Sequence, residues 1–220
     1  MRRIIVSEFL SLDGVMEDPG GAEKTKRGGW AFQFERGPEG DKFKLDEVME
    51  AGALLLGRVT YEGFAEAWPS RDGEFADKMN GMPKYVVSTT LKKAAWNNTQ
   101  VIKSNLPEAL SGLKAGPGGD ILVAGSGRLA QTLAQHGLVD EYRLMVYPVI
   151  LGAGKRLFEG TSASSAGPGA GRVQAGWRRH PDPGLSSAEK VLMVPDRPFR
   201  RYDDIKSLSR QYIHPDRQDP

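Results

Sequence analysis

DILVAGSGRLAQTLAQHGLVDEYRLMVYPVILGAGKRLF, residues 120–158, is the stretch that decides the fold. Its first apolar run, Ile121 to Ala124, is typical of a buried strand. A glycine turn follows, and after it an amphipathic helix is predicted with Leu129, Leu133 and His136 on one face. Gly137 stands where helices commonly end, and a second strand is predicted from Tyr142 to Ile150. The stretch therefore predicts a strand–turn–helix–strand unit.

The turn of this unit is a candidate phosphate site. A glycine-rich turn between a strand and a helix leaves backbone N–H groups unpaired at the positive end of the helix dipole, where phosphate binds readily. The alternative is that the turn only makes a tight connection. We predict that the turn holds the pyrophosphate of a dinucleotide, with these candidate residues: Gly125, Ser126, Gly127, Arg128 and Leu129.

Two other predicted strands end in polar turns. Ala53 to Leu56 leads into Gly57, Arg58 and Thr60, and a helix is expected from Tyr61 to Trp68. Lys84 to Val87 leads into Ser88 and Thr89. Repeated strand–helix–strand order predicts an open α/β sheet, in which ligands bind at the carboxyl ends of the strands. Three such turns on one edge favour a multiply phosphorylated ligand.

The first strand is expected from Ile4 to Leu12, with apolar residues on both faces as in a central strand. It ends in Asp13-Gly14, which either faces a ligand cleft or is only a turn. A long loop is expected from Pro19 to Gly40, where Trp30, Phe32 and Phe34 either cover the site or pin the loop to the core. A helix is expected from Asp41 to Gly52, with its lysines and acids mostly on the face opposite Leu45, Val48 and Met49.

Composition narrows the function classes. The chain has 220 residues, 39% hydrophobic and 26% charged, with a net charge of +2. This is ordinary for a soluble globular protein and gives no argument for nucleic acid. There is no cysteine, and His136, His180 and His214 lack ligand spacing, so we expect no metal site. No signal peptide or membrane-spanning run is expected, which predicts a cytoplasmic protein.

The turn formally fits the Rossmann fingerprint G-x-G-x-x-A. That fingerprint requires an acid at the carboxyl end of the next strand, where it holds the ribose. Asp140 and Glu141 stand at the start of that strand instead, and Pro148 suits a strand end. We therefore reject the standard Rossmann interpretation.

Taken in order, several motifs resemble the dihydrofolate reductase-like superfamily, and most closely the C-terminal reductase domain of the bacterial bifunctional riboflavin-biosynthesis deaminase-reductases. The resemblance covers roughly residues 3–160. The motifs are Ser11-Leu12-Asp13-Gly14, Leu56 to Glu62, Val87-Ser88-Thr89-Thr90, Ile121 to Leu129, Val139-Asp140-Glu141 and Pro148 to Phe158.

The resemblance implies an α/β fold with a central, mostly parallel sheet, helices on both faces and a closing antiparallel strand pair, which the atypical end of this chain could alter. It also implies NADPH as cofactor, a small heterocyclic substrate and a homodimer. The family substrate is a phosphoribosylamino-pyrimidine, so the implied activity is that of a 5-amino-6-(5-phosphoribosylamino)uracil reductase or a dihydrofolate reductase. The alternative is a non-catalytic, dimeric nucleotide-binding protein that keeps the cofactor cradle. A flavin or another phosphate compound is a third, weaker interpretation.

Carried over residue by residue, the resemblance assigns the adenosine phosphates to Gly57, Arg58 and Thr60 and to Ser88 and Thr89. It assigns the pyrophosphate to the glycine turn. Asp13 is the candidate catalytic residue, since it stands at a strand end near the nicotinamide in the family. Asp41, at the start of the expected helix, has a spacing similar to the catalytic carboxylate of dihydrofolate reductases, although an acid there is more often a cap.

Arg58 carries the cofactor preference. Its planar cationic fork suits phosphate, and we expect no acid beside either turn to repel that phosphate. We therefore expect NADPH to bind more tightly than NADH.

The end of the chain departs from the family. Residues 161–220 are rich in Ser, Ala, Gly and Pro and then in Arg, Asp and Pro. We expect a reductase domain over residues 1–160 and an atypical, partly disordered extension over residues 161–220. Within it, residues 172–177 and 190–194 could form a poor hairpin, and disorder is expected from Pro195 onward.

Overall fold

The computed structural model describes residues 1–159, 171–174 and 178–179. Its centre is a seven-stranded sheet in the order β5-β4-β3-β6-β1-β7-β8, in which every pairing is parallel. The strands are β1 (Ile4–Ser11), β3 (Ala51–Gly57), β4 (Lys84–Val87), β5 (Thr99–Ile102), β6 (Asp120–Ala124), β7 (Glu141–Tyr147) and β8 (Gly171–Gln174).

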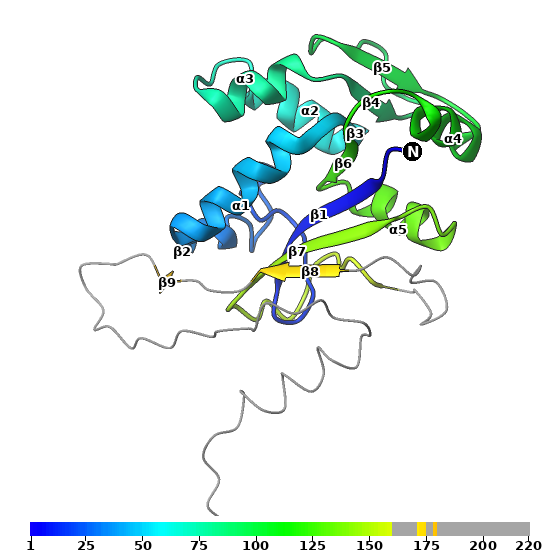
Figure 1. Cartoon of the computed structure of the whole chain (residues 1–220). Coiled ribbons are helices and arrows are strands. Elements are labelled where there is room, and N and C mark those ends of the chain that lie inside the picture. The colour runs from blue at the N-terminus through cyan, green and yellow to red at the C-terminus, as the bar shows by residue number, and fades with distance from the viewer. Residues whose placement is uncertain (160–170, 175–177, 180–220) are drawn as a thin grey trace, which may run out of the picture.

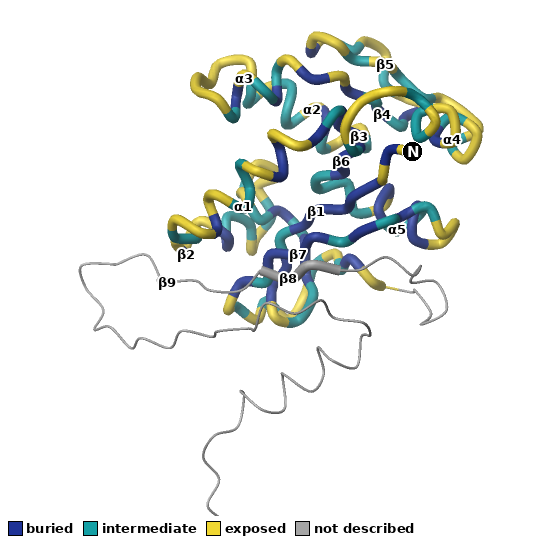
Figure 2. The backbone as a smooth tube through the Cα atoms, in the orientation of Figure 1, coloured by how far each residue is buried: buried dark blue, intermediate teal, exposed yellow. Residues whose placement is uncertain are grey.

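Helices lie on both faces of this sheet, and the strands between them are the most buried part of the molecule (Figures 1 and 2). On one face, Val48, Tyr61 and Met79 pack with Ile5 and Leu54 of the strands. They belong to α1 (Gly37–Glu50), α2 (Arg58–Ala67) and α3 (Glu74–Gly81).

On the other face, Leu110, Leu129 and Leu133 pack with Ile4 and Val123. They belong to α4 (Leu106–Ala115) and α5 (Gly127–Gln135). Because neighbouring strand residues point to opposite faces, Ile4 and Ile5 serve different cores. The prediction of a mostly parallel sheet with helices on both faces is confirmed.

The closing strand differs from the one that the resemblance implied. Within the described residues, β8 pairs with β7 in the parallel sense, with Leu144 opposite Val173. The antiparallel pairing that the structure does describe lies elsewhere, between β2 (Phe34–Glu35) and β9 (Arg178–Arg179). The sheet therefore ends, as far as it is described, in a parallel strand.

The segment expected to be a long loop contains structure. A 3-10 helix, η1 (Trp30–Gln33), precedes β2, and α1 already begins at Gly37 rather than at Asp41. The Trp30 ring packs edge-on against Tyr147, 5.3 Å between ring centroids, and its indole N–H donates to the Glu17 carbonyl. Phe34 is also buried, whereas Phe32 is 72% exposed. Trp30 and Phe34 thus pin the segment to the core.

Parts of the predicted extension lie outside the described residues, including residues 190–194 and everything from Pro195 onward. The boundary at residue 160 stays a prediction. No helix in the described part of the chain is long and apolar enough to cross a membrane.

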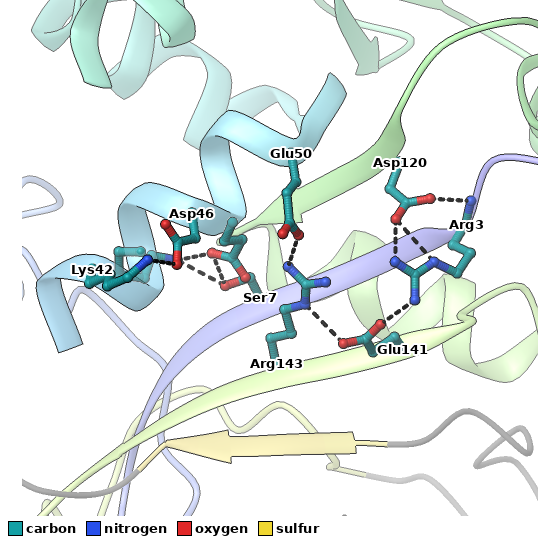
Figure 3. Close-up of polar contacts among 10 residues, drawn as sticks. Arg3, Ser7, Lys42, Asp46, Glu50, Asp120, Glu141 and Arg143 are labelled. Carbon is teal, nitrogen blue, oxygen red and sulfur yellow. Dashed lines mark hydrogen bonds and ion pairs between the residues drawn. The ribbon is translucent and has the colours of Figure 1, made fainter. Parts of the chain in front are cut away.

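Charged side chains tie the amino-terminal half of the sheet together. Arg3 donates to Asp120, at 2.5 Å, and to Glu141, at 2.8 Å. Arg143, which is buried, donates to Glu141 at 2.9 Å and lies 3.6 Å from Glu50 of α1 (Figure 3). This ladder joins β6, β1, β7 and α1. Glu141 is therefore a structural residue at the amino end of β7, away from the carboxyl edge, as the rejection of the Rossmann interpretation requires.

Candidate active site

The carboxyl edge of the sheet brings the three predicted turns side by side. Gly57 ends β3, Ser88 follows β4 and Gly125 follows β6. Because β4, β3 and β6 are neighbours and parallel, these three residues lie at one edge. The topology therefore supports a shared binding surface.

Two of the turns are stapled to each other by hydrogen bonds. The Ser126 N–H donates to the Thr60 hydroxyl at 2.9 Å. In return, the Gly57 N–H donates to the Ser126 hydroxyl, also at 2.9 Å. Thr60 and Ser126 thus hold the shape of the edge through protein contacts. Their side chains act first as positioning groups.

The glycines of the turn lie close to neighbouring side chains. Gly125 has φ +59°, and a Cβ there would lie 3.0 Å from the Thr60 Cγ2. A Cβ on Gly127 would lie 2.9 Å from the Met16 sulfur. A side chain at Gly125 would be strained by the positive φ and would press on Thr60, whereas at Gly127 the flexible Met16 side chain would have to move aside. The chain after β1 thereby also reaches the turn, at Met16.

Three N–H groups remain for a ligand. The Gly125 N–H bonds the Glu8 carboxyl, the Ser126 N–H bonds Thr60, and the Ala130 N–H bonds the Ser126 carbonyl at 3.0 Å. The first-turn N–H groups of a helix have no partner within it, and they carry the positive end of the dipole. This arrangement fits a pyrophosphate. The residues that offer these groups are Gly127, Arg128 and Leu129.

The side chains of these residues differ in what they can add. The Leu129 side chain is buried in the core between the sheet and the helices α4 and α5, so only its backbone is available to a ligand. The Arg128 side chain is exposed. It is therefore the one cation carried by the turn itself.

Arg58 opens α2 directly after Gly57, as predicted, but it has a partner. Its guanidinium donates to Glu62 at 2.8 Å, one helical turn on, and both side chains are nearly half exposed. The expectation that no acid stands beside this turn is therefore wrong, because a spacing of four residues on a helix brings the two together. An incoming phosphate must share Arg58 with Glu62 or displace it.

A cavity of about 410 Å³ lies at the carboxyl ends of β4 and β5, lined by residues 87–90 and 102–106. The Ser88 hydroxyl accepts the N–H groups of Thr90, at 3.1 Å, and Leu91, at 2.9 Å, which fixes the turn. Thr89 is exposed. Lys103 supplies a cation that sequence reasoning missed. Lys103 directly follows the strand β5, and the parallel pairing of β4 with β5 places it beside Ser88, which directly follows β4. This position after a strand was the signal for Lys103 in the sequence.

Asp13 follows β1 and binds the chain that follows β7. Its carboxylate accepts the Ser11 hydroxyl at 2.7 Å and the N–H groups of Leu151, at 3.1 Å, and Gly152, at 2.8 Å. Burial raises the pKa of Asp13, but these hydrogen bonds outweigh it and leave the pKa below its ordinary value. Asp13 is thus held as an anion, which suits a positioning role better than proton donation. Its catalytic role stays a prediction.

Asp41 does not open α1. It lies in the second turn, is largely exposed and forms an ion pair with Arg36 at 2.9 Å. The ion pair with Arg36 supports a structural role for Asp41 rather than a catalytic one.

Two buried acids were missed by sequence reasoning. Glu47 of α1 is 2% exposed, although acids were expected on the outer face; Met49 is exposed instead. Glu47 accepts the Ser7 hydroxyl at 2.8 Å and pairs with Lys44. Glu8 of β1 is 4% exposed. The sequence did contain a signal for Glu8, because it is an acid in the middle of a strand that we expected to be buried on both faces.

In the described part of the chain, no group of three histidines, aspartates or glutamates is placed to hold a metal ion. The site is therefore built from backbone N–H groups, hydroxyls, cations and buried carboxyls.

Comparisons with known proteins agree with this architecture. The chain is 31% identical over 162 residues to the uncharacterized protein YyaP of Bacillus subtilis, covering 71% of this chain and 80% of that protein. It is 27% identical over 157 residues to the uncharacterized protein YwjB of the same organism, covering 71% and 83%. A putative riboflavin biosynthesis protein from Shewanella sp. PV-4 has the same fold, with a TM-score of 0.55, 22% identity, and coverage of 70% and 82%.

The family described as the RibD C-terminal domain matches residues 2–177, which span the whole sheet, both stapled turns and β8. The resemblance seen in the sequence motifs is thereby confirmed. The chain belongs to the RibD C-terminal domain family.

Proposed function

We propose that this protein is an NADPH-dependent reductase of a small heterocycle, of the 5-amino-6-(5-phosphoribosylamino)uracil type or a related pyrimidine or pterin. The observation that carries the proposal is the anion site at the start of α5. Its three N–H groups lie beside Gly125, whose positive φ and close contact with Thr60 disfavour any side chain there. Family membership supports the reductase class.

The extended shape of a dinucleotide fits the order of the turns along the edge. The pyrophosphate would bind the N–H groups of residues 127–129, and the adenosine end would reach the cavity beside Ser88 and Lys103. Arg58 stands between the two, at the end of β3, and would meet a phosphate on the adenosine ribose. When bound, NADPH supplies a hydride to the substrate. The residues of the chain bind and orient the two molecules.

A two-step experiment tests the proposal. NADPH binding to the full chain is measured by fluorescence titration, and NADPH oxidation is then followed after addition of the ribosylamino-pyrimidine, and separately of dihydrofolate. We expect micromolar or tighter binding and oxidation with one of the two substrates. A chain that does not bind NADPH refutes the proposal.

Binding without oxidation would favour the second candidate, a nucleotide-binding protein without reductase chemistry. The observation in its favour is the state of Asp13, whose carboxylate accepts the N–H groups of Leu151 and Gly152 and pairs with Arg156 at 3.3 Å. We further propose a homodimer, as the family resemblance implies, and a cytoplasmic location. Sedimentation of the purified chain tests the dimer.

A further inference from the structure

Glu8 is an unusual residue for its place in the fold. It lies in the middle of β1, opposite Leu144 of β7, and shares a strand face with Val6 and Leu10. Those three neighbours belong to the apolar core on the side of α4 and α5. A carboxylate transferred to such surroundings loses its hydration, so a buried acid needs partners or becomes neutral.

The partners of Glu8 are few. Its carboxyl accepts the Gly125 N–H, the first donor of the glycine turn. Its Oε1 is buried and has no hydrogen-bond partner among the described residues. The charged groups that act on it are Lys44 and Glu47 of α1. Lys44 is already bound to Glu47 and donates to the Ser7 hydroxyl at 2.9 Å, so its charge is largely committed.

Burial therefore decides the protonation state. It raises the pKa of Glu8 well above the ordinary value, against the opposing effects of Lys44 and of the Gly125 N–H. A neutral carboxyl has one O–H donor and one acceptor oxygen. Because the Gly125 N–H requires an acceptor oxygen, the proton belongs on Oε1, the oxygen without a partner. Glu8 thus carries a buried donor beneath the turn.

A neutral acid suits this position electrostatically. The turn above it is the proposed pyrophosphate site, and an ionised Glu8 would repel that group. A buried donor without an acceptor is costly, so a ligand that accepts from it gains more than it would at a hydrated surface. The place of this donor beside the anion site and the cost of leaving it unpaired both favour a ligand atom as the partner of Oε1.

We propose that Glu8 is a ligand-contacting residue of the reductase site, a neutral carboxyl whose Oε1–H donates to an amide-type carbonyl of the bound ligand. The nicotinamide carboxamide and a pyrimidinone ring both carry such a carbonyl. This inference rests on the proposed function and adds a binding residue to it. No bond is made or broken at Glu8 in this role.

Two substitutions separate the proposal from a structural role. Glu8→Gln keeps an acceptor for the Gly125 N–H and an N–H donor in place of Oε1–H, without an ionisable group. Glu8→Leu is apolar and removes both. The affinities for NADPH and, with NADP⁺ present, for the ribosylamino-pyrimidine are measured between pH 6 and pH 9, together with the thermal unfolding of the ligand-free chain.

We expect Glu8→Leu to fold with a melting temperature close to that of the wild type, because it removes a buried unpaired donor but also leaves the Gly125 N–H without its acceptor. It should weaken one of the two ligands by about five- to tenfold, the value of one hydrogen bond of about 1 kcal/mol or slightly more. Loss of NADPH affinity assigns the contact to nicotinamide. Loss of pyrimidine affinity alone assigns it to the substrate.

Glu8→Gln should retain most of that affinity and remove its pH dependence. In the wild type, affinity should fall as pH rises through the raised pKa of Glu8, since the ionised form has no donor. The ligand-free wild type should also lose stability relative to Glu8→Gln over the same rise, because the folded state holds the proton more tightly than the unfolded state.

The outcomes are distinct. A wild type that does not bind NADPH refutes the proposed function, and the contact falls with it. A wild type that binds NADPH, with Glu8→Leu equal to it in both affinities, refutes the contact and leaves the function standing. A wild type and Glu8→Gln with identical pH profiles of binding and unfolding would show that Glu8 is not the neutral donor described.

Discussion

Gly125→Ala tests directly whether the glycine turn shapes the anion site. Gly125 has φ +59°, a conformation that costs an L-residue about 1–2 kcal/mol. The new Cβ would also lie 3.0 Å from the Thr60 Cγ2 and 3.1 Å from its Oγ1. Overpacking of this kind costs about 1–3 kcal/mol. We therefore expect a total loss in the free energy of unfolding of about 2–5 kcal/mol.

Gly137 offers a matched control. It has φ +63° at the other end of α5, and a Cβ there meets no atom within 4 Å. Gly137→Ala therefore pays the conformational cost of about 1–2 kcal/mol without the clash. Because Thr60 holds the Ser126 N–H, the clash in Gly125→Ala should also displace the anion site. Gly137→Ala should leave that site intact.

The assay pairs urea unfolding with NADPH titration of each variant. We expect Gly125→Ala to weaken NADPH by at least tenfold and Gly137→Ala to change it by less than about threefold, the latter equivalent to under about 0.7 kcal/mol. Adding Thr60→Ser to Gly125→Ala removes the Cγ2 and should recover part of the stability while keeping the hydroxyl. Equal losses of stability and of NADPH affinity in Gly125→Ala and Gly137→Ala would refute the stapled-turn account.

Three further predictions concern single groups. Arg58→Ala should weaken the binding of NADPH by about tenfold and change the binding of NADH little. The loss is smaller than for an unpaired arginine because Arg58 also binds Glu62, and Lys103→Ala in the neighbouring cavity serves as the comparison. Equal losses for both cofactors would assign Arg58 to the pyrophosphate or to the fold. Asp13→Asn should cost about 1–3 kcal/mol of stability at neutral pH, because charge-assisted hydrogen bonds are weakened. Since the folded pKa of Asp13 is lowered, this difference should be present above the unfolded pKa of about 3.9 and vanish as pH falls through the folded value; a constant difference across that range would contradict the assignment. Deleting residues 195–220 should leave the melting temperature and NADPH affinity almost unchanged, and a drop of many degrees would show that the segment packs on the core.

The sequence predicts the sheet well because its signals are local. The strands expected from Ile4 to Leu12 and from Ala53 to Leu56 end in turn residues, and they correspond to the central parallel strands β1 and β3. The boundaries of α1 were predicted less well. Its start at Gly37 uses Pro38 in the first turn, where a missing N–H costs nothing, and the expected helix began only at Asp41. Such a start is a property of the first turn rather than of the periodic face on which the prediction relied.

What sequence spacing could not supply is the partner of each side chain. Thr60 and Ser126 are 66 residues apart, and their hydrogen bond exists only because β3 and β6 are neighbours in the sheet. The same holds for Asp13, whose partners Leu151 and Gly152 lie in the chain that follows β7.

Glu8 is the clearest case, because the sequence shows an acid within an apolar strand but does not show which groups that acid contacts. An acid at that position could have paired with a cation across the sheet. Lys44 is near enough to lower the pKa of Glu8, yet its ammonium is bound to Glu47 and Ser7. Only the contacts in the structure show that the Lys44 ammonium is bound elsewhere and that the hydrogen-bond donor to Glu8 is the N–H of Gly125. The same glycine that shapes the anion site therefore ties the buried acid to it, which is why substitutions at Gly125 and Glu8 should affect ligand affinity together.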